Sequence, residues 1–429
     1  MATLSAAAAA APSSAAMLSR SGIPSSSFRK STSLTSLLCP RVKLPTNTSS
    51  SMSVKSKHNE TDDSNLPPLP SKRTVVGVGT ITLDFLAKVE TYPEPDAKIR
   101  STDSLAQGGG NVGNALTAAA RLGLSPRVFS KVGKDAAGVG ILEELEGDGV
   151  DVSHVVVAEE GVSPFTYVIV DEKTKTRTCI HTPGYPPFEP EEYSSSAISS
   201  LLSGADLLYL DGRIPDAAIP IAEEASKRGV PIILDAERKR EGLDTLLTYA
   251  DYLVTSAKFP QVWTEAPSLG ESLILLASRL PRLKFVIVTQ GSAGCVMFER
   301  KESEKLEVLD VHQTLESLWK GAQVFSGSKP TVVSSEVGVL RRPKAENEEG
   351  CVGRLLIGTP DSVPSAELVD TTGAGDAFIG AVMYCLCAEL PPERMLPLGA
   401  VVAAAKCRAL GARTGLPLRG DARVVSCLL

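Results

Sequence analysis

The chain has 429 residues, of which 43% are hydrophobic and 22% are charged, the composition of a globular protein with ample material for a core. Its formal net charge of −6 at pH 7 provides no broad basic surface, so we expect no nucleic-acid partner. No apolar run reaches the roughly 18 residues that a membrane-spanning helix needs, so we expect no membrane partner.

The first 65 residues have the composition of a leader rather than of a folded domain. Residues 1–59 contain no Asp or Glu, carry seven Lys and Arg residues, and are rich in serine and alanine. Such a segment cannot build a core, and it matches an organellar transit peptide. Because serine outweighs arginine, we expect delivery to the chloroplast (plastid stroma). The alternatives are delivery to the mitochondrion, or a tail without an address on a cytoplasmic protein.

From residue 73 onward, short apolar runs alternate with helical stretches. Strands are expected at residues 74–89, 126–133, 205–212, 231–237, 250–256 and 284–291. Helices are expected between several of them, for example at residues 114–123 and 216–229. This alternation predicts an α/β fold, a mainly parallel sheet with helices on both faces. In such open sheets, ligands bind beyond the carboxyl ends of the strands.

Two other segments alternate polar and apolar residues and predict a small antiparallel sheet. They lie near residues 94–106 and 163–183, and the second contains a turn at "DEKTKT". We expect this sheet to act as a β lid beside the core. The stretch 299–350 is charged and irregular, and we predict that it is a surface insertion in a folded domain that spans residues 73–429.

Two glycine clusters lead into helical patterns. In "VDTTGAGDAFIGAV", residues 369–382, the glycines precede Asp376. A helix N-terminus suits an anion, so Asp376 is either a simple cap or a carboxylate that acts beside a bound phosphate. In "AQGGGNVGNALTAAARLG", Asn111 and Asn114 follow Gly110. Their amides either bind a polyol or cap the helix.

Together these residues resemble the ribokinase-like, or pfkB, family of carbohydrate kinases. "DTTGAGDAF" is similar to the family's C-terminal signature, "GGGNVGNALTAAARLG" to its N-terminal one, and "VTQGSAG" to the segment that lines the nucleotide. The resemblance covers residue 73 to the C-terminus apart from the insertion. "TYPEPDAKIR", "LDGRIPD" and "AAAKCRALGARTGLPLRGD" look like segments of the ketohexokinase-type branch.

The resemblance implies an ATP-dependent kinase in which Asp376 is the general base. The backbone of Gly373, Ala374 and Gly375 would form the anion hole for the γ-phosphate. Residues implied to bind the acceptor sugar are Asp84, Gly110, Asn111, Asn114, Asp96 and Arg213. Residues implied to line the nucleotide are Thr289, Gly291 and Gly294. Mg²⁺ would arrive with ATP, and Asp370 resembles a ligand of a monovalent cation, so activation by K⁺ is an expectation.

Several of these residues also have a purely structural interpretation. Asp84, expected to end the first strand, could be a turn or cap residue, and Asp370 could simply hold its loop. Arg213 could form an ordinary surface salt bridge. In ketohexokinase-like relatives two lids clasp each other and a loop reaches the partner's sugar. We therefore predict a homodimer through the β lid with Asp96 in that loop, although a solvated acidic loop is the alternative.

The sequence is compatible with several classes of acceptor. A ketose such as fructose is favoured by the ketohexokinase-like segments, while ribose or a nucleoside would contact the same residues. Outside catalysis, the alternative is a ribokinase-like structural partner of the plastid machinery. Many family members carry an N-x-x-E motif, but the matching segment here, "YLVTSAKFPQVW", lacks its glutamate. The ketohexokinase-like branch lacks this glutamate as well. The intact loop around Asp376 favours catalysis.

Overall fold

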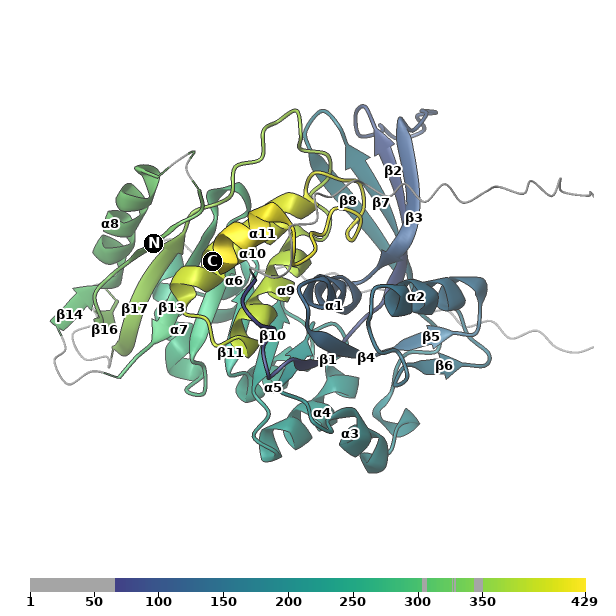
Figure 1. Ribbon diagram of the computed structural model, residues 1–429, viewed down its shortest axis with the longest axis horizontal. Helices are drawn as coiled ribbons and strands as arrows, with labels where there is room; N and C mark the ends of the chain where they lie inside the picture. The colour runs from purple at the N-terminus through teal and green to yellow at the C-terminus, as the bar shows by residue number, and fades with distance from the viewer. Residues whose placement is uncertain (1–65, 303–306, 326, 328, 343–349) are drawn as a thin grey trace, which may run out of the picture. The chain divides into compact units, whose positions relative to one another are not determined.

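The computed structural model describes residues 66–302, 307–325, 327, 329–342 and 350–429 (Figure 1). The predicted leader, residues 1–65, lies outside these residues. Among the described helices, none is long and apolar enough to cross a bilayer. Seven cysteines fall within the described residues, and all of them are free thiols.

A mainly parallel sheet forms the centre of the fold. Six parallel strands lie side by side in the order β4 (Ser125–Phe129), β1 (Thr74–Val78), β9 (Leu207–Leu210), β10 (Ile232–Ala236), β11 (Tyr252–Thr255) and β12 (Phe285–Thr289). Most of their residues are buried, because helices cover both faces of the sheet. The predicted α/β fold is confirmed.

Beyond β12 the sheet continues with mostly antiparallel strands. In spatial order these are β13 (Cys295–Arg300), β17 (Cys351–Gly358), β16 (Gly338–Arg341) and β14 (Glu307–Asp310), with β15 (Val332–Ser334) also paired to β17. Helix α8 (Val311–Gln323) buries Val311, Leu315 and Leu318 against this part of the sheet. The described residues of the stretch 299–350 are thus regular rather than irregular, and their apolar positions pack into the core, while the insertion itself stays a prediction. The polar residues 303–306 and 343–349 lie outside the described residues.

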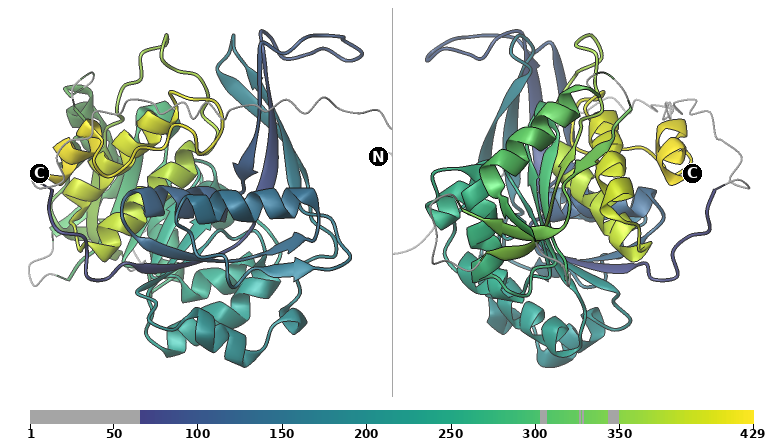
Figure 2. Two further views of the ribbon diagram at one scale, coloured as in Figure 1. Left: turned by 45° about the vertical axis from the view of Figure 1, so that its right-hand side comes forward. Right: turned by 90° about the vertical axis from the view of Figure 1, so that its left-hand side faces the viewer.

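Helices form a layer on each face of the sheet, as the right-hand view of Figure 2 shows. One face packs against α1 (Asn111–Arg121), α2 (Ala136–Gly147), α9 (Ala374–Cys387), α10 (Pro392–Lys406) and α11 (Ala422–Leu428). The other packs against α3 (Ser195–Leu201), α4 (Pro215–Lys227), α5 (Leu243–Tyr249), α6 (Phe259–Thr264), α7 (Leu269–Arg279) and α8. The short strands β5 (Lys131–Gly133) and β6 (Val156–Ala158) form a separate parallel pair.

A second, four-stranded sheet stands beside the core above α1 and α2 (Figure 1). Its strands are β3 (Asp103–Gly109), β2 (Thr82–Val89), β7 (Phe165–Asp171) and β8 (Thr176–Thr182). Two antiparallel hairpins, β2–β3 and β7–β8, are joined by a parallel pairing of β2 with β7. The predicted lid therefore exists, but it includes β2, which the sequence analysis had joined to the first core strand. Asp84 accordingly lies inside β2 and does not end the first strand.

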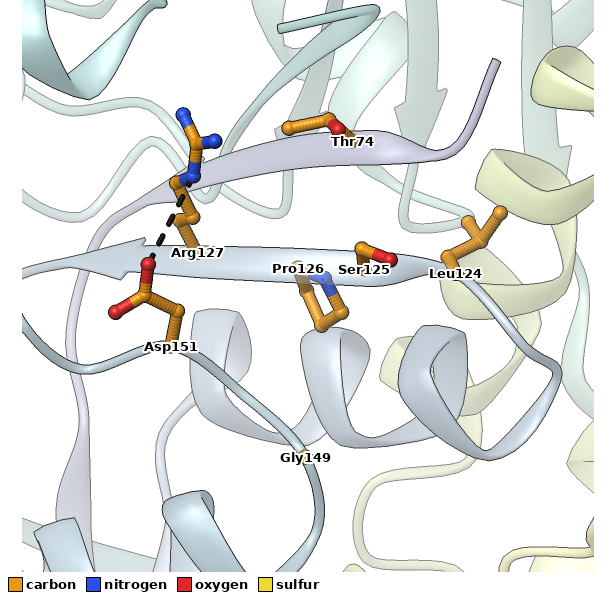
Figure 3. A pocket seen from close by; sticks show the side chains of 7 residues that line it. All are labelled: Thr74, Leu124, Ser125, Pro126, Arg127, Gly149 and Asp151. Atoms are coloured by element: carbon orange, nitrogen blue, oxygen red, sulfur yellow. Dashed lines mark ion pairs between the residues drawn. The ribbon is translucent and has the colours of Figure 1, made fainter. Parts of the chain in front are cut away.

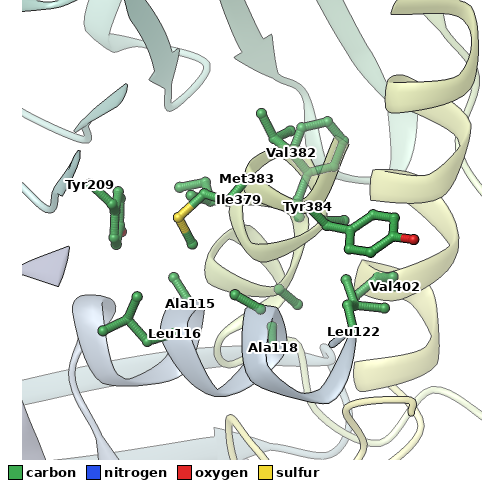
Figure 4. Packing of buried hydrophobic residues seen from close by; sticks show 14 of the residues in the cluster. Ala115, Leu116, Ala118, Leu122, Tyr209, Ile379, Val382, Met383, Tyr384 and Val402 are labelled. Atoms are coloured by element: carbon green, nitrogen blue, oxygen red, sulfur yellow. The ribbon is translucent and has the colours of Figure 1, made fainter. Parts of the chain in front are cut away.

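Close packing of α1 on α9 sets the geometry of the site described below (Figure 4). Ala115 and Ala118 of α1 face Ile379 and Met383 of α9 within one buried cluster. At Gly380 a Cβ would lie only 2.5 Å from the Cβ of Ala118. Small residues on both helices therefore let the two backbones approach each other closely.

Candidate active site

The candidate site lies where the carboxyl ends of parallel strands meet the N-termini of two helices. Asp211 directly follows β9, and Asp235 is the fourth residue of β10. Asn111 opens α1 and donates from Nδ2 to Oδ2 of Asp235 over 3.4 Å. Asn114 of α1 donates from Nδ2 to Oδ2 of Asp376, in the first turn of α9, over 2.8 Å. The two glycine clusters of the sequence thus converge at one edge of the sheet.

The loop before α9 presents backbone donors next to Asp376. Gly373 is the N-cap of α9 with a φ of 75°, a left-handed conformation that favours glycine. A Cβ on Gly373 would lie 2.7 Å from the Cβ of Ala412, whereas a Cβ on Gly375 would meet nothing within 4 Å. The N–H groups of the first turn, which includes Ala374, have no partner within the helix. An anion can therefore approach the positive end of α9 at Gly375.

The environment of Asp376 raises its pKa to about 6, chiefly because the carboxylate is removed from solvent. The hydrogen bond from Asn114 and the positive charge of Arg213 act in the opposite direction and lower this pKa. The result is a carboxylate that is ionised at neutral pH but close enough to its pKa to accept a proton. That is the property required of a general base.

Asn114 holds Asp376 in place and is itself held by a buried arginine. Arg413 is fully buried and donates from Nε to Oδ1 of Asn114 over 3.1 Å. It also donates from Nη2 to the carbonyl oxygen of Gly109 over 3.0 Å, and its Nη1 lies 3.5 Å from Oε1 of Glu144. Asn114, predicted as a sugar ligand, therefore has a visible positioning role, because it fixes the carboxylate of Asp376.

The glycine run before α1 makes room for two charged side chains. Asp84 is only 7% exposed, and burial raises the pKa of its carboxyl. A Cβ on Gly109 would lie 2.1 Å from Oδ2 of Asp84, and one on Gly108 would lie 2.5 Å from Nη1 of Arg413. Gly110, the N-cap of α1, has a φ of 84°, and a Cβ there would lie 2.2 Å from a backbone oxygen. The run serves side-chain and backbone packing at the base of the lid.

Arg213 lies within a cluster of acidic groups rather than in an ordinary surface salt bridge. Its Nη2 donates to Oε2 of Glu237 over 2.5 Å and to Oδ1 of Asn111 over 3.2 Å. Burial and the neighbouring carboxylates, Asp376 foremost, raise the pKa of Asp235 well above its usual value. The pKa of Asp211 is also raised, by burial. One arginine thus faces several carboxylates, of which the buried ones favour the protonated form.

The residues predicted to line a nucleotide stand at the carboxyl end of β12. Thr289 is the last residue of β12 and donates from Oγ1 to the carbonyl oxygen of Thr255 over 3.1 Å. Gly291 and Gly294 flank a short turn with φ values of 59° and 93°. At Gly294 a Cβ would lie 2.1 Å from the carbonyl oxygen of Gly358. Both glycines are needed for the turn itself, whatever it binds.

Asp96 and Asp370 occupy contrasting surroundings. Asp96 is exposed in the loop between β2 and β3 and has a φ of 63°. Asp370 is 2% exposed, and the ammonium of Lys406 lies 3.8 Å from its Oδ2. Within the residues that the structure describes, no group of three or more His, Cys, Asp or Glu side chains is arranged to hold a metal ion.

A surface hollow of about 300 Å³ lies at the opposite edge of the main sheet (Figure 3). It is lined by Thr74 and Ser125, the first residues of β1 and β4, and by an ion pair in which Nε of Arg127 lies 3.7 Å from Oδ2 of Asp151. These are the amino-terminal ends of the strands. The hollow therefore has no part in the cluster around Asp376.

Both glycine loops and Asp376 lie within the residues that a known family model matches. The model for the pfkB family carbohydrate kinases matches residues 72–314 and 358–419, which is most of the chain. The chain belongs to the pfkB family of carbohydrate kinases. As such it is a phosphotransferase with an alcohol group as acceptor. The unmatched residues 315–357 include most of α8 and the strands β15 and β16.

Curated relatives of this carbohydrate kinase include enzymes with different sugar names. The chain is 26% identical to a ribokinase of Arabidopsis thaliana over 366 residues, which cover 83% of this chain and 80% of the relative. It is 23% identical to a ketohexokinase of Mus musculus, covering 78% and 96%. It is 28% identical to an ATP-dependent ribose-1-phosphate kinase of Halopiger xanaduensis, but only over 38% of this chain and 54% of that relative.

Solved structures share the fold of this carbohydrate kinase. A putative ribokinase from Agrobacterium tumefaciens superposes with a TM-score of 0.62 at 24% identity, covering 83% of this chain and 97% of that one. The ribokinase of Arabidopsis thaliana, solved with ribose and ATP, superposes with a TM-score of 0.60 at 21% identity, covering 83% and 99%. These similarities establish the ribokinase-like fold.

Several residues of this carbohydrate kinase that shape the site were not singled out from its sequence. Arg413 and Lys406 both lie in the quoted segment "AAAKCRALGARTGLPLRGD", but charged residues near a helix end are usually solvated. Asp235 and Glu237 end the strand-like run "PIILDAE". The rule that ligands bind at the carboxyl ends of strands is the signal that could have pointed to these two acids.

Proposed function

We propose that this carbohydrate kinase transfers the γ-phosphate of ATP to a hydroxyl of a small free sugar, with Asp376 as general base. The observation that carries the proposal is the hydrogen-bonded carboxylate at the N-terminus of α9, beside the backbone of Gly373, Ala374 and Gly375, where the amide of Ala374 donates to the carbonyl oxygen of Thr371 over 3.2 Å. The Asp376 pKa of about 6 matches the task at neutral pH.

In the proposed reaction, Oδ of Asp376 takes the proton of the acceptor hydroxyl while that oxygen attacks the γ-phosphorus of ATP. The bond from the γ-phosphorus to the bridging oxygen of ADP breaks, and ADP leaves. The amides at the start of α9 stabilise the negative charge on the transferred group. Mg²⁺, which would be bound together with ATP, supplies neutralising charge on the phosphates.

On the acceptor side, we propose that the sugar hydroxyls are bound by polar groups on α1 and on the inner face of the lid. Asn111 already contacts Arg213 and Asp235, so these three form a connected donor and acceptor set beside Asp376. The carboxylate of Asp84 on β2 lies against Gly109, next to Gly110 at the start of α1, and we propose that both contribute to this set. Hydrogen-bond donors and acceptors together suit a polyol, because each hydroxyl can both donate and accept.

A ketose such as fructose is the acceptor that we propose first. It is supported by the ketohexokinase-like segments of the sequence and by the similarity to a curated ketohexokinase over 78% of the chain. Ribose is the second candidate, because proteins named ribokinase from several organisms match this chain over about four fifths of its length. A nucleoside is a further alternative.

The test is a comparison of initial rates with ATP and fructose, ribose or a nucleoside, monitored through ADP formation, on wild type and on Asp376→Asn. We expect phosphorylation of fructose, and an about 10²–10⁴-fold loss of turnover in the variant with ATP binding retained. Preferred phosphorylation of ribose would replace the ketose proposal. Absence of turnover with every acceptor, in protein that binds ATP, would favour the structural partner of the plastid machinery.

We also propose that the protein is a homodimer in which the outer faces of two lids meet. Phe85, Tyr167 and Ile180 are paired across the sheet, and their side chains are 38%, 51% and 51% exposed. The opposite face buries Leu86 and Val168 against Leu410. An exposed row of large apolar residues on a small sheet is a surface that a second copy can cover. Asp96 would then lie in the loop that reaches the partner's sugar.

The leader is proposed to deliver the protein to the plastid stroma. This proposal rests on the serine-rich, acid-free composition of residues 1–59. A fusion of residues 1–65 to a fluorescent protein should accumulate in chloroplasts, and a fusion of the chain without them should not. Fluorescence of the leader fusion in mitochondria or in the cytosol would reject the plastid proposal.

A further inference from the structure

A lysine ammonium is buried beneath the loop that carries the proposed anion hole. Lys406 is the last residue of α10, and its side chain is wholly inaccessible to solvent. Its Nζ donates to the carbonyl oxygen of Asp370 over 2.6 Å and to that of Ala409 over 3.4 Å. It also lies 3.8 Å from Oδ2 of Asp370. A buried ammonium is stable only with such oxygen partners around it.

The oxygens of Asp370 are already engaged. Its Oδ1 accepts hydrogen bonds from the backbone nitrogen and the hydroxyl of Thr372, over 2.9 and 2.7 Å. Its Oδ2 accepts one from the nitrogen of Gly411 over 3.0 Å and faces the ammonium of Lys406. A free K⁺ beside these oxygens would be placed against a fixed positive charge, which repels it. The residues present therefore do not fit the monovalent cation that the sequence had suggested.

The buried ion pair is connected directly to the proposed phosphate site. Asp370 and Thr372 lead without interruption into Gly373, the N-cap of α9. From the lid, Arg177 donates from Nη1 to Oγ1 of Thr371 over 2.9 Å and contacts the same loop. The direction in which the amides at Gly373 point is thus set by how Asp370 is held. Removing the charge of Lys406 would leave Asp370 buried and uncompensated, and would release this loop.

We propose that the ammonium of Lys406 is a tethered monovalent cation that holds the 370–376 loop ready for ATP, so that this kinase needs no K⁺. The inference rests on the proposed role of that loop as the γ-phosphate site. Lys406 is a positioning residue in this account, because it touches the loop and not the reacting atoms. The sequence led us to expect activation by K⁺, whereas this proposal gives an enzyme that works without K⁺.

The first test measures wild type in K⁺-free buffer and in about 100 mM K⁺, with tetramethylammonium keeping the ionic strength constant. We expect the ATP affinity, measured by calorimetry without acceptor, to differ by less than about twofold between the two buffers, and we expect the same of kcat/KM. A twofold change is smaller than the change that coupling between two binding sites usually produces. An increase of about fivefold or more on addition of K⁺ would overturn the proposal. Failure of wild type to bind ATP would instead reject the proposed function.

The second test replaces the tethered cation. Lys406→Ala removes the charge and opens space, so its ATP affinity should fall about 10- to 100-fold, and K⁺ or NH₄⁺ should restore most of it. Lys406→Met removes the charge but fills the space, so its loss should not be restored. Lys131→Ala is the matched control, because the side chain of Lys131 is only 6% exposed and its Nζ lies 2.5 Å from Oε1 of Glu192, outside the loop.

A cation-specific recovery separates positioning from simple stability. Lys131→Ala should lose stability, and K⁺ should not alter its ATP affinity. If Lys406→Ala is too unstable for binding experiments, its melting temperature should rise with K⁺ but not with tetramethylammonium. A folded Lys406→Ala variant with wild-type ATP affinity in K⁺-free buffer, or one that no monovalent cation restores or stabilises, would overturn the proposal.

Discussion

Asn114 donates a 2.8 Å hydrogen bond from Nδ2 to Oδ2 of Asp376, and this bond joins the first turns of α1 and α9 across 262 residues of sequence. The amide opposes the effect of burial, because it stabilises the ionised form of Asp376 and lowers its pKa. Arg413 donates from Nε to the oxygen of the same amide over 3.1 Å. The proposed base is therefore tuned from the helix that also carries Asn111, a residue proposed to bind the acceptor.

Removal of the Asn114 amide should move the acid limb of the pH profile. In wild type, kcat/KM should fall as the pH drops through about 6, where Asp376 becomes protonated. In Asn114→Ala the ionised form loses a donor, so the pKa of Asp376 rises and the acid limb moves to higher pH by about one unit. The measurement is kcat/KM against pH.

Asn111→Ala serves as the control for this prediction, because Asn111 contacts Asp235 and Arg213 but makes no hydrogen bond to Asp376. Its KM for the sugar should rise, with an acid limb that moves less than that of the Asn114 variant. An Asn114→Ala enzyme whose acid limb coincides with wild type would show that the amide does not tune the base.

Asp376→Asn should be more stable than wild type above about pH 6. The pKa of Asp376 is raised from 3.8 to about 6 in the folded state, so ionisation disfavours folding. The stability of wild type is therefore highest below the unfolded pKa and is lost as the pH rises through the folded pKa. The difference in unfolding free energy should be about 1–3 kcal/mol near pH 8 and shrink as the pH approaches 4. Urea titrations at several pH values measure it, and a pH-independent difference would contradict the raised pKa.

Gly380→Ala should destabilise the contact between α1 and α9. Its Cβ would lie 2.5 Å from Cβ of Ala118 and 2.9 Å from the carbonyl oxygen of Ala115, so the helices must move apart. We expect a loss of about 1–3 kcal/mol, together with reduced kcat through the displaced Asn114–Asp376 pair. Gly140→Ala is the matched control, since a Cβ at that position inside α2 meets nothing within 4 Å. It should be neutral or stabilising by up to about 1 kcal/mol, and equal thermal stability of the two variants would refute the packing argument.

The lid interface should be broken by a charge on its outer face. Tyr167→Glu places a carboxylate in the exposed row beside Phe85, whose ring centroid lies 5.6 Å from that of Tyr167. We expect light scattering to report a dimer for wild type and a monomer for the variant. Asp96→Ala should leave the dimer intact and raise the KM for the sugar more than that for ATP. A wild-type monomer, with a sugar KM insensitive to Asp96→Ala, would exclude the clasp and leave an intramolecular lid.

The sequence alone determined the family and the class of fold. Residues 369–382 contain glycines, then a carboxylate, then a helical apolar pattern. This order is specific to a phosphate site with a base, because an anion can be bound beside a base only where all three features occur at a helix N-terminus. The apolar runs ending in Asp or Thr predicted the parallel sheet, since buried strands must be continuously apolar. The lid was visible as alternation, but its strand β2 was hidden within a longer apolar run.

Only the tertiary structure decided which charged residues are buried and what they hold. Lys406 and Arg413 have the local appearance of solvated helix-end residues, and the carboxylate and amide side chains that they contact lie far away in sequence. Asp370 lies 36 residues from Lys406 and Asn114 lies 299 residues from Arg413, so the fold alone brings them together. A buried charge is stable only when oxygens or amides from distant segments surround it, and no local pattern encodes that arrangement. For the same reason, the sequence suggested a free cation at Asp370, and the structure placed an ammonium there.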